Sequence, residues 1–400
     1  MPEVLPVQPL RRPPTSAGAR PFALWNLGFR PFYLLASIFA ALSIPLWTMQ
    51  YAGYLPGAYP GNPAVHGHEM LFGFALAVVT GFLFTAVRNW TGQSTPSGAM
   101  LAGFAVLWIA GRVLMLTPYA TAAAVANAAF PLAVAVGIGI PMVKSGNRRN
   151  YFFVALFAMF GLIALSLHLS GAGVLDWPQR VGLQIGLDLV LFIIAVMAGR
   201  VIPMFTNNGV PGAGASRHAL VERVALGSVL ALLAADLLQA PLAAIAGVAA
   251  LAAIAHGIRL ALWRPWRALR APLVWVLHAA YGWIVVYLVL RALAAAGLVA
   301  APFATHALTI GAIGGMTLGM MTRTARGHTG RMLVADGYEV AAFALVQLAA
   351  VVRVFGGIAV PDAYLVTIVG AGACWSGAFA IYAIRYWPVL SRPRLDGKPG

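Results

Sequence analysis

Long apolar runs, each closed by a short polar or charged segment, recur along most of this 400-residue chain. A helix needs about 20 apolar residues to cross a bilayer, and runs of that size predict about twelve transmembrane helices. The predicted spans are residues 31–51, 64–87, 98–117, 119–143, 150–173, 180–202, 221–239, 241–262, 272–297, 303–322, 337–358 and 361–385. Residues 23–388 would form one twelve-helix domain, with a disordered cytoplasmic tail at 1–22 and a second cytoplasmic tail at 389–400.

Composition narrows the class of protein. Hydrophobic residues make up 61% of the chain and charged residues only 9%, against about 25% charged residues in an ordinary soluble domain. These values exclude a soluble enzyme, a disordered scaffold and a nucleic-acid binder. The single cysteine, Cys374, excludes an intrachain disulfide and a cysteine-based metal site. We therefore expect an all-α polytopic membrane protein embedded in a lipid bilayer.

The positive charges support the count of helices and orient them. If the N-terminus faces the cytoplasm, 22 of the 26 Lys and Arg residues fall on the inner side. The outer side keeps only Arg112, Arg180, Arg291 and Arg353. This asymmetry follows the positive-inside rule, and a miscounted helix would scramble it. The pattern predicts that both termini are cytoplasmic.

Polar residues inside the spans are the candidates for chemistry, because burying them in lipid is costly. His66 and His68 open the second span, followed directly by Glu69. Residues at i and i+2 point to different sides of a helix. Either both imidazoles bind one metal across a frayed helix start, or one points into the bundle and the other orients it. Glu69 could hold a ligating imidazole in the right tautomer. The alternative is a pair of interfacial histidines bonded to backbone carbonyls.

The second and tenth spans resemble each other at an offset of 238 residues. The offset pairs His68 with His306, Gly73 with Gly311, Ala77 with Gly315, Gly81 with Gly319, Arg88 with Arg326, and Thr91-Gly92 with Thr329-Gly330. We interpret this as an internal repeat that places His68 and His306 at matching depth. Two imidazoles at one depth on facing helices suit a bis-histidine haem. Coincidence within Gly- and Ala-rich helices is the competing explanation.

Two further polar residues within spans are candidates for chemistry. Asp188, in the sixth span, should face the interior and could orient a ligand histidine or relay protons, or else bond to neighbouring helices. His278, in the ninth span, could be a ligand or a core histidine. His168, His218 and His256 are interpreted as structural or interfacial. The second, sixth and tenth spans are each four apart, which suggests a three-times-four pseudo-repeat.

Several of these segments together resemble one known family. Residues 28–32 (GFRPF), 66–73 (HGHEMLFG), 89–92 (NWTG), 200–203 (RVIP), 306–309 (HALT) and 327–330 (GHTG) are similar to those of the NnrS family. The resemblance implies a bacterial inner-membrane, multi-pass protein associated with haem, copper, denitrification and defence against nitric oxide. It would carry the cofactor role onto His66, His68, His278 and His306 without assigning haem or copper to each. It implies no particular reaction and names no electron donor.

A wider analogy is to subunit I of haem–copper oxidases and nitric oxide reductases, which also has twelve helices with haem-binding histidines on the second and tenth. That subunit places copper ligands on its sixth and seventh helices, where this chain has no histidine, so an oxygen-reducing centre is not expected. Two alternative functions stay open. One is a secondary transporter, although the offset of eight helices does not match two six-helix halves. The other is an assembly factor that delivers metal or haem to a partner complex.

Overall fold

The computed structural model describes residues 22–55 and 62–398. Within these residues the regular secondary structure is entirely helical, with turns and loops between the helices. The described helices form twelve runs, in agreement with the predicted spans. In order they are α1 (Phe29–Tyr51); α2 (Pro63–His68), η1 (Glu69–Ala75) and α3 (Leu76–Thr91); α4 (Gly98–Leu114); α5 (Ala120–Lys144); η2 (Arg148–Asn150) and α6 (Phe152–Gly171); α7 (Gln179–Gly209); α8 (Ala219–Leu237); α9 (Leu242–Leu262) and η3 (Pro265–Arg267); α10 (Pro272–Ala295); α11 (Ala301–His306), η4 (Ala307–Gly314) and α12 (Gly315–His328); α13 (Gly337–Val351), η5 (Val352–Gly356) and α14 (Gly357–Ala359); η6 (Pro361–Ala363) and α15 (Tyr364–Ser391).

Ten of these runs are long and apolar enough to cross a membrane. The other two are α4, an apolar helix of 17 residues, and α8, which carries Glu222, Arg223 and Asp236. The fold is therefore that of a multi-pass membrane protein in contact with a lipid bilayer. Of the predicted tail at 1–22, only Phe22 lies within the described residues, and α15 continues to Ser391, past the predicted boundary at residue 388.

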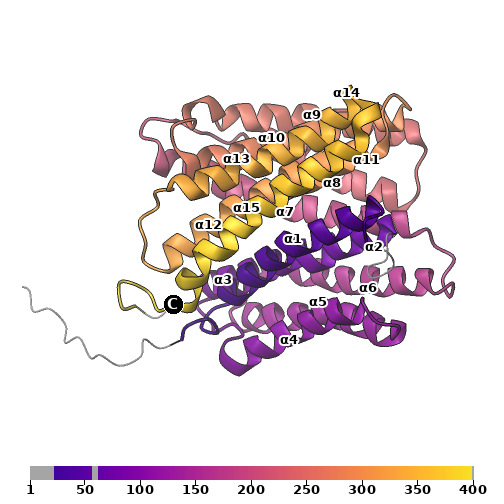
Figure 1. The fold of residues 1–400 in the computed structure, drawn as a ribbon. Coiled ribbons are helices and arrows are strands. Elements are labelled where there is room, and N and C mark those ends of the chain that lie inside the picture. Colours follow the sequence, from indigo (N-terminus) through magenta and orange to yellow (C-terminus); the bar gives the residue numbers. More distant parts are fainter. Residues whose placement is uncertain (1–21, 56–61, 399–400) are drawn as a thin grey trace, which may run out of the picture.

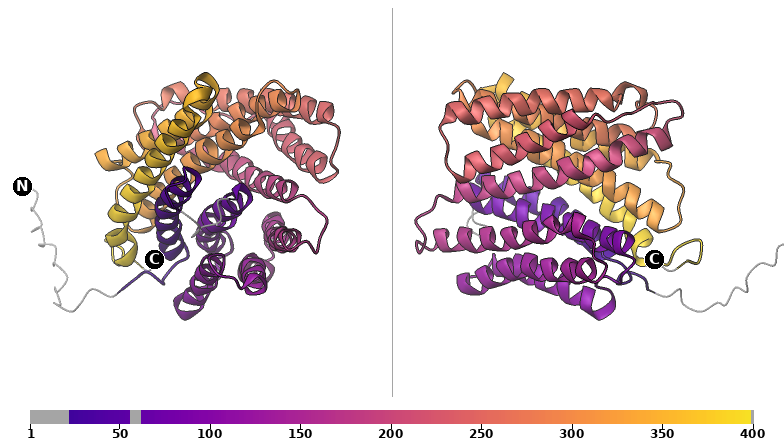
Figure 2. Two further views of the ribbon diagram at one scale, coloured as in Figure 1. Left: turned by 45° about the vertical axis from the view of Figure 1, so that its right-hand side comes forward. Right: turned by 180° about the vertical axis from the view of Figure 1, so that it is seen from behind.

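The helices run side by side, with the early helices α3–α6 on one side of the bundle and α8–α13 on the other (Figure 1). Between them, α1 packs along α15 and α3, and α7 contacts both α6 and α8. The two ends of the described chain lie at one end of the bundle, where the Ala23 backbone N–H donates to the Ser391 carbonyl at 2.8 Å. We call the opposite end, which holds α2, α11 and α14, the distal end (Figures 1 and 2).

Local sequence explains several helix boundaries. Asn62 caps α2 by accepting from the Ala64 backbone N–H at 2.9 Å, with Pro63 at the first helical position. Asp336 and Glu339 form a reciprocal capping box at the start of α13. Gly92 ends α3 at φ +65°, a left-handed conformation that glycine adopts without a steric cost.

The second and tenth runs share their local geometry at the predicted offset. In each, a short α-helix ends at the histidine and a π-helical segment, η1 or η4, follows directly after His68 or His306. Thr91 and Thr329 each donate to the carbonyl four residues earlier at 2.6 Å. Gly330 has φ +73°, like Gly92. The pairing of residues thus extends to backbone conformation, while the three-times-four arrangement stays a prediction.

Glycines in the tenth run allow neighbouring helices to approach closely. Adding a methyl group at one of them therefore tests the packing. A Cβ at Gly311 would overlap the indole of Trp283, and that indole is held by a 2.8 Å hydrogen bond to Gln347. We expect Gly311→Ala to destabilise the protein by about 1–3 kcal/mol, as overpacking does. Thermal unfolding in detergent would measure this as a lowered Tm.

The control is Gly103→Ala, because a Cβ at Gly103 on α4 meets no atom within 4 Å. That change should be neutral or raise stability by about 0.5–1 kcal/mol, since alanine favours a helix more than glycine does. An equal response of the two variants would contradict the close contact at Gly311.

Candidate functional site: buried histidines at the distal end

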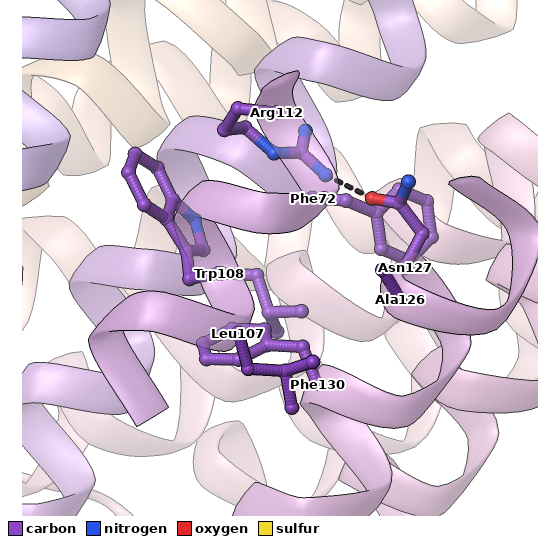
Figure 3. Close-up of a pocket in the computed structure, with 9 residues that line it drawn as sticks. Phe72, Leu107, Trp108, Arg112, Ala126, Asn127 and Phe130 are labelled. Atoms are coloured by element: carbon purple, nitrogen blue, oxygen red, sulfur yellow. Dashed lines mark hydrogen bonds between the residues drawn. The ribbon is translucent and has the colours of Figure 1, made fainter. Parts of the chain in front are cut away.

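His68, the last residue of α2, is a buried polar residue at the distal end. Its Nδ1 lies 3.0 Å from Oε1 of Glu69, and Arg112 donates through Nη1 to the same oxygen at 2.6 Å. Arg112 also donates through Nη2 to Asn127 on α5, as Figure 3 shows. All four side chains are buried, the arginine being the most exposed at 9%. The result is a continuous chain of hydrogen bonds across α2, η1, α4 and α5.

The π-helical segment η1 explains part of this arrangement. A π-helix widens the turn and displaces backbone carbonyls from the regular ladder. The Gly73 carbonyl in η1 accepts from Nε1 of Trp108 at 3.0 Å. Trp108 and Arg112 lie one turn apart on α4, so α4 contacts η1 at both Gly73 and Glu69. Trp108, Leu107 and Phe130 line the small cavity beneath Arg112 (Figure 3).

The bond to Glu69 determines the tautomer of His68. A carboxylate only accepts hydrogen bonds, so Nδ1 of His68 carries the proton and Nε2 holds the free lone pair. Nε2 is buried and has no hydrogen-bond partner among the described residues. The ring of His168 on α6 stands edge-on to that of His68, with centroids 5.1 Å apart. Nε2 of His168 likewise has no partner in the described part of the chain.

His66 and His306 belong to a second group of side chains at the distal end. The ring of His66 stacks on Trp47 of α1 with centroids 4.2 Å apart. Nδ1 of His306 donates to the Pro302 carbonyl at 2.6 Å, which leaves the lone pair on Nε2. His306 lies close enough to both His66 and Arg353 to interact with them electrostatically. The two histidines of α2 therefore have different neighbours, because α2 is a regular helix.

His278 lies in α10, away from these groups. Thr206 on α7 donates to the Ile202 carbonyl at 2.8 Å, so its hydroxyl oxygen accepts from Nε2 of His278 at 2.9 Å. The lone pair then sits on Nδ1, which is buried and unpartnered among the described residues. This histidine has the free nitrogen that a ligand requires, and its hydrogen-bond partner is Thr206.

Asp188 is fully buried in α7. Its Oδ1 accepts from Gln184 at 2.9 Å, and Asp236 on α8 is a neighbouring carboxyl. Arg291 on α10 donates to both oxygens of Asp236 at 2.5 and 2.6 Å. The one hydrogen bond of the Asp188 carboxyl comes from Gln184, and its Oδ2 is buried without a partner among the described residues. Its predicted role in orienting a ligand histidine stays a prediction.

The predicted site residues thus fall into separate places. His68 meets Glu69 and His168, whereas His66, His306 and Arg353 lie close together. Pairing of His68 with His306 across one haem stays a prediction, because the contacts described for the two rings run to different partners. Among residues 22–55 and 62–398, no three His, Cys, Asp or Glu side chains are grouped closely enough to hold a metal ion by themselves.

Sequence reasoning missed His168 and Arg112 as neighbours of His68. His168 lies near the end of the fifth predicted span, at about the depth where the second span begins. This shared depth was the one signal that could have indicated His168 as a neighbour of His68. Arg112 is one of the four predicted outer cations, and an acidic residue at matching depth is the partner that such a cation requires.

The donor atoms that are free fit an imidazole-bound metal or haem. Nε2 of His68 and Nδ1 of His278 are buried lone-pair sites without a described partner, and Nε2 of His168 is also buried without one. A ligating histidine typically donates its other ring N–H to a carboxylate or carbonyl, as His68 does to Glu69 and His306 does to Pro302. The chemistry of the site is therefore that of neutral imidazoles held in one tautomer.

A bundle of twelve helices with a buried, oriented His68 and three half-buried histidines near one end defines a polytopic membrane protein with an internal polar site. The chain belongs to the NnrS protein family, whose model matches residues 23–394. This confirms the resemblance found in the sequence motifs. No curated protein matches the chain.

Proposed function

We propose that the protein binds haem and copper in the bacterial inner membrane and acts in the response to nitric oxide, by binding or redox-processing nitric oxide or its metal-nitrosyl products. Membership of the NnrS family supports the membrane location and the link to nitric oxide. The proposed cofactor residues are His66, His68, His278 and His306, with His168 added as the neighbour of His68.

The observation that carries the proposal is the state of His68. Its Nδ1 donates to Glu69, and its Nε2 is a buried base with no described partner. An unsatisfied buried polar atom is costly, and a coordinated metal would satisfy it. Glu69 keeps the proton on Nδ1, and Arg112 fixes the position of the Glu69 carboxylate. A bound haem iron or copper would supply an open coordination position and a change of redox state.

The test is an optical spectrum and a metal analysis of protein purified in detergent from cells supplied with haem and copper. We expect a haem absorption band, bound copper, and a shift of the band when nitric oxide is added. His306→Ala should lower the haem content, whereas His218→Ala should not, because His218 is exposed ahead of α8. Protein that contains neither haem nor copper would refute the proposal.

The two alternatives give different results in the same preparation. An assembly factor would hold metal weakly and below one equivalent per chain. A secondary transporter would accumulate a solute in proteoliposomes without any haem band.

A further inference from the structure

Arg353 differs from the other buried arginines in its partners, because it bonds to neither a carboxylate nor a backbone carbonyl among the described residues. Four arginines are buried in the described residues: Arg30, Arg112, Arg259 and Arg353. Glu69 pairs with Arg112 and Glu222 with Arg259, at 2.6 Å in both cases. Arg30 donates to the carbonyls of Leu390 and Arg392 at the end of α15, where the helix dipole is negative.

The guanidinium of Arg353 has no such compensation. This residue is 5% exposed and lies in the π-helical segment η5. Its Nη2 donates to the phenol oxygen of Tyr364 at 2.8 Å, while Nη1 is buried and has no partner among the described residues. A phenol offers a neutral oxygen and not a counter-charge. An unpaired charge at this depth costs several kcal/mol by general estimates, unless an anion accompanies it.

Arg353 has no acidic side chain bonded to it among the described residues. His66 and His306 are neighbouring histidines of the guanidinium. Glu69 also interacts with His66, but its carboxylate is already bonded to Arg112. Asp362, the nearest acidic residue along the chain, is exposed on η6.

Arg353 and Tyr364 each keep a donor that is not used within the described residues. Its oxygen accepts from Arg353, so its O–H hydrogen is free to donate. The guanidinium carbon lies 4.9 Å from the centre of the Tyr364 ring, which keeps the two groups together. Nη1 and the phenol O–H are thus two donors from adjacent groups, and an anion with two oxygens can accept from both.

We propose that Arg353 and Tyr364 bind a small oxyanion with two oxygens, of the size of nitrite or formate, at the distal end beside His66 and His306. The buried position of Nη1 favours a compact anion over a lipid headgroup. The site needs no metal, so it stands independently of the proposed function.

The test is equilibrium binding of nitrite and of formate to the full-length protein in nanodiscs of zwitterionic lipid. The wild-type protein should bind the anion saturably. Arg353→Gln should weaken binding by at least about tenfold, since a hydrogen bond to a charged group is lost. Tyr364→Phe should weaken it by a smaller factor and, because it keeps the arginine, tests the site even if Arg353→Gln fails to fold. The control, Arg180→Gln, removes an exposed arginine at the start of α7 and should leave binding unchanged.

A bound haem or copper could itself take up nitrite, so His68→Ala provides the second comparison. Our proposal expects anion binding to survive the loss of metal in that variant. Absence of saturable binding in the wild type would overturn the proposal. So would binding that disappears in His68→Ala and persists in Arg353→Gln and Tyr364→Phe.

Discussion

Replacing His68 by alanine is expected to lower the affinity for its metal or haem by more than about 100-fold. Loss of an outer hydrogen-bond partner of a ligand alone costs about 10- to 100-fold, and this change removes the ligand itself. The fold should persist, because the His68 ring makes only one hydrogen bond, to Glu69, and the variant loses only that bond. Metal analysis and the haem absorption band of the purified variant measure the effect.

Glu69→Gln tests the origin of that effect. Glutamine can still contact Nδ1 of His68 but lacks the charge that holds the proton there, so affinity should fall by about 10- to 100-fold. His256→Ala is the matched control, since both nitrogens of this buried histidine are already bonded, to Tyr281 and to the Ala225 carbonyl. That variant should lose stability and retain its metal. Equal metal loss in His68→Ala and His256→Ala would count against ligation by His68.

Removing Arg112 is expected to give the largest loss of stability. Arg112→Met leaves the Glu69 carboxylate buried without its cation, and breaking a buried pair in this way costs about 3–5 kcal/mol. The double variant Glu69→Gln with Arg112→Met removes both charges and should recover most of that stability. Unfolding in detergent, followed for both single variants and the double variant, gives the coupling energy.

An exposed pair provides the comparison for Arg112. Arg385 and Asp336 lie 2.7 Å apart, but their side chains are 48% and 37% exposed. Arg385→Met should cost less than about 1 kcal/mol, because solvent screens an exposed ion pair. A loss at Arg112 no greater than the loss at Arg385 would contradict the role of burial.

The helices were predictable because crossing a membrane requires about 20 apolar residues in a row, and such runs can be read directly from the sequence. The π-helical segments were not. An extra residue in a turn is stabilised by neighbours, such as Trp108 bonding the Gly73 carbonyl, and those neighbours come from another helix. Two of these segments, η1 and η4, lie at matching positions in the second and tenth spans, because each follows its histidine directly.

The sequence indicated how deep each candidate side chain lies along its helix. It did not indicate which neighbouring helix that side chain faces. Glu69 was expected to hold an imidazole through its carboxylate, and it does bond to Nδ1 of His68. His168 and Arg353 were missed as partners because a sequence fixes how far along a helix a residue lies, while the lateral order of helices decides which side chains face each other. The ligand roles of His66, His68, His278 and His306 stay predictions that metal analysis tests.

The double attachment of α4 to η1 has a mechanical consequence. Trp108 holds a carbonyl of the widened turn, and one turn later Arg112 holds the carboxylate that orients His68. Trp108 and Arg112 lie on one face of the same helix. Sliding or tilting of α4 is therefore expected to change the backbone of η1 and the orientation of the His68 imidazole at the same time. α4 has 17 residues, fewer than any of the ten candidate spans. A displacement of this one helix is therefore expected to reach the His68 ring through Glu69.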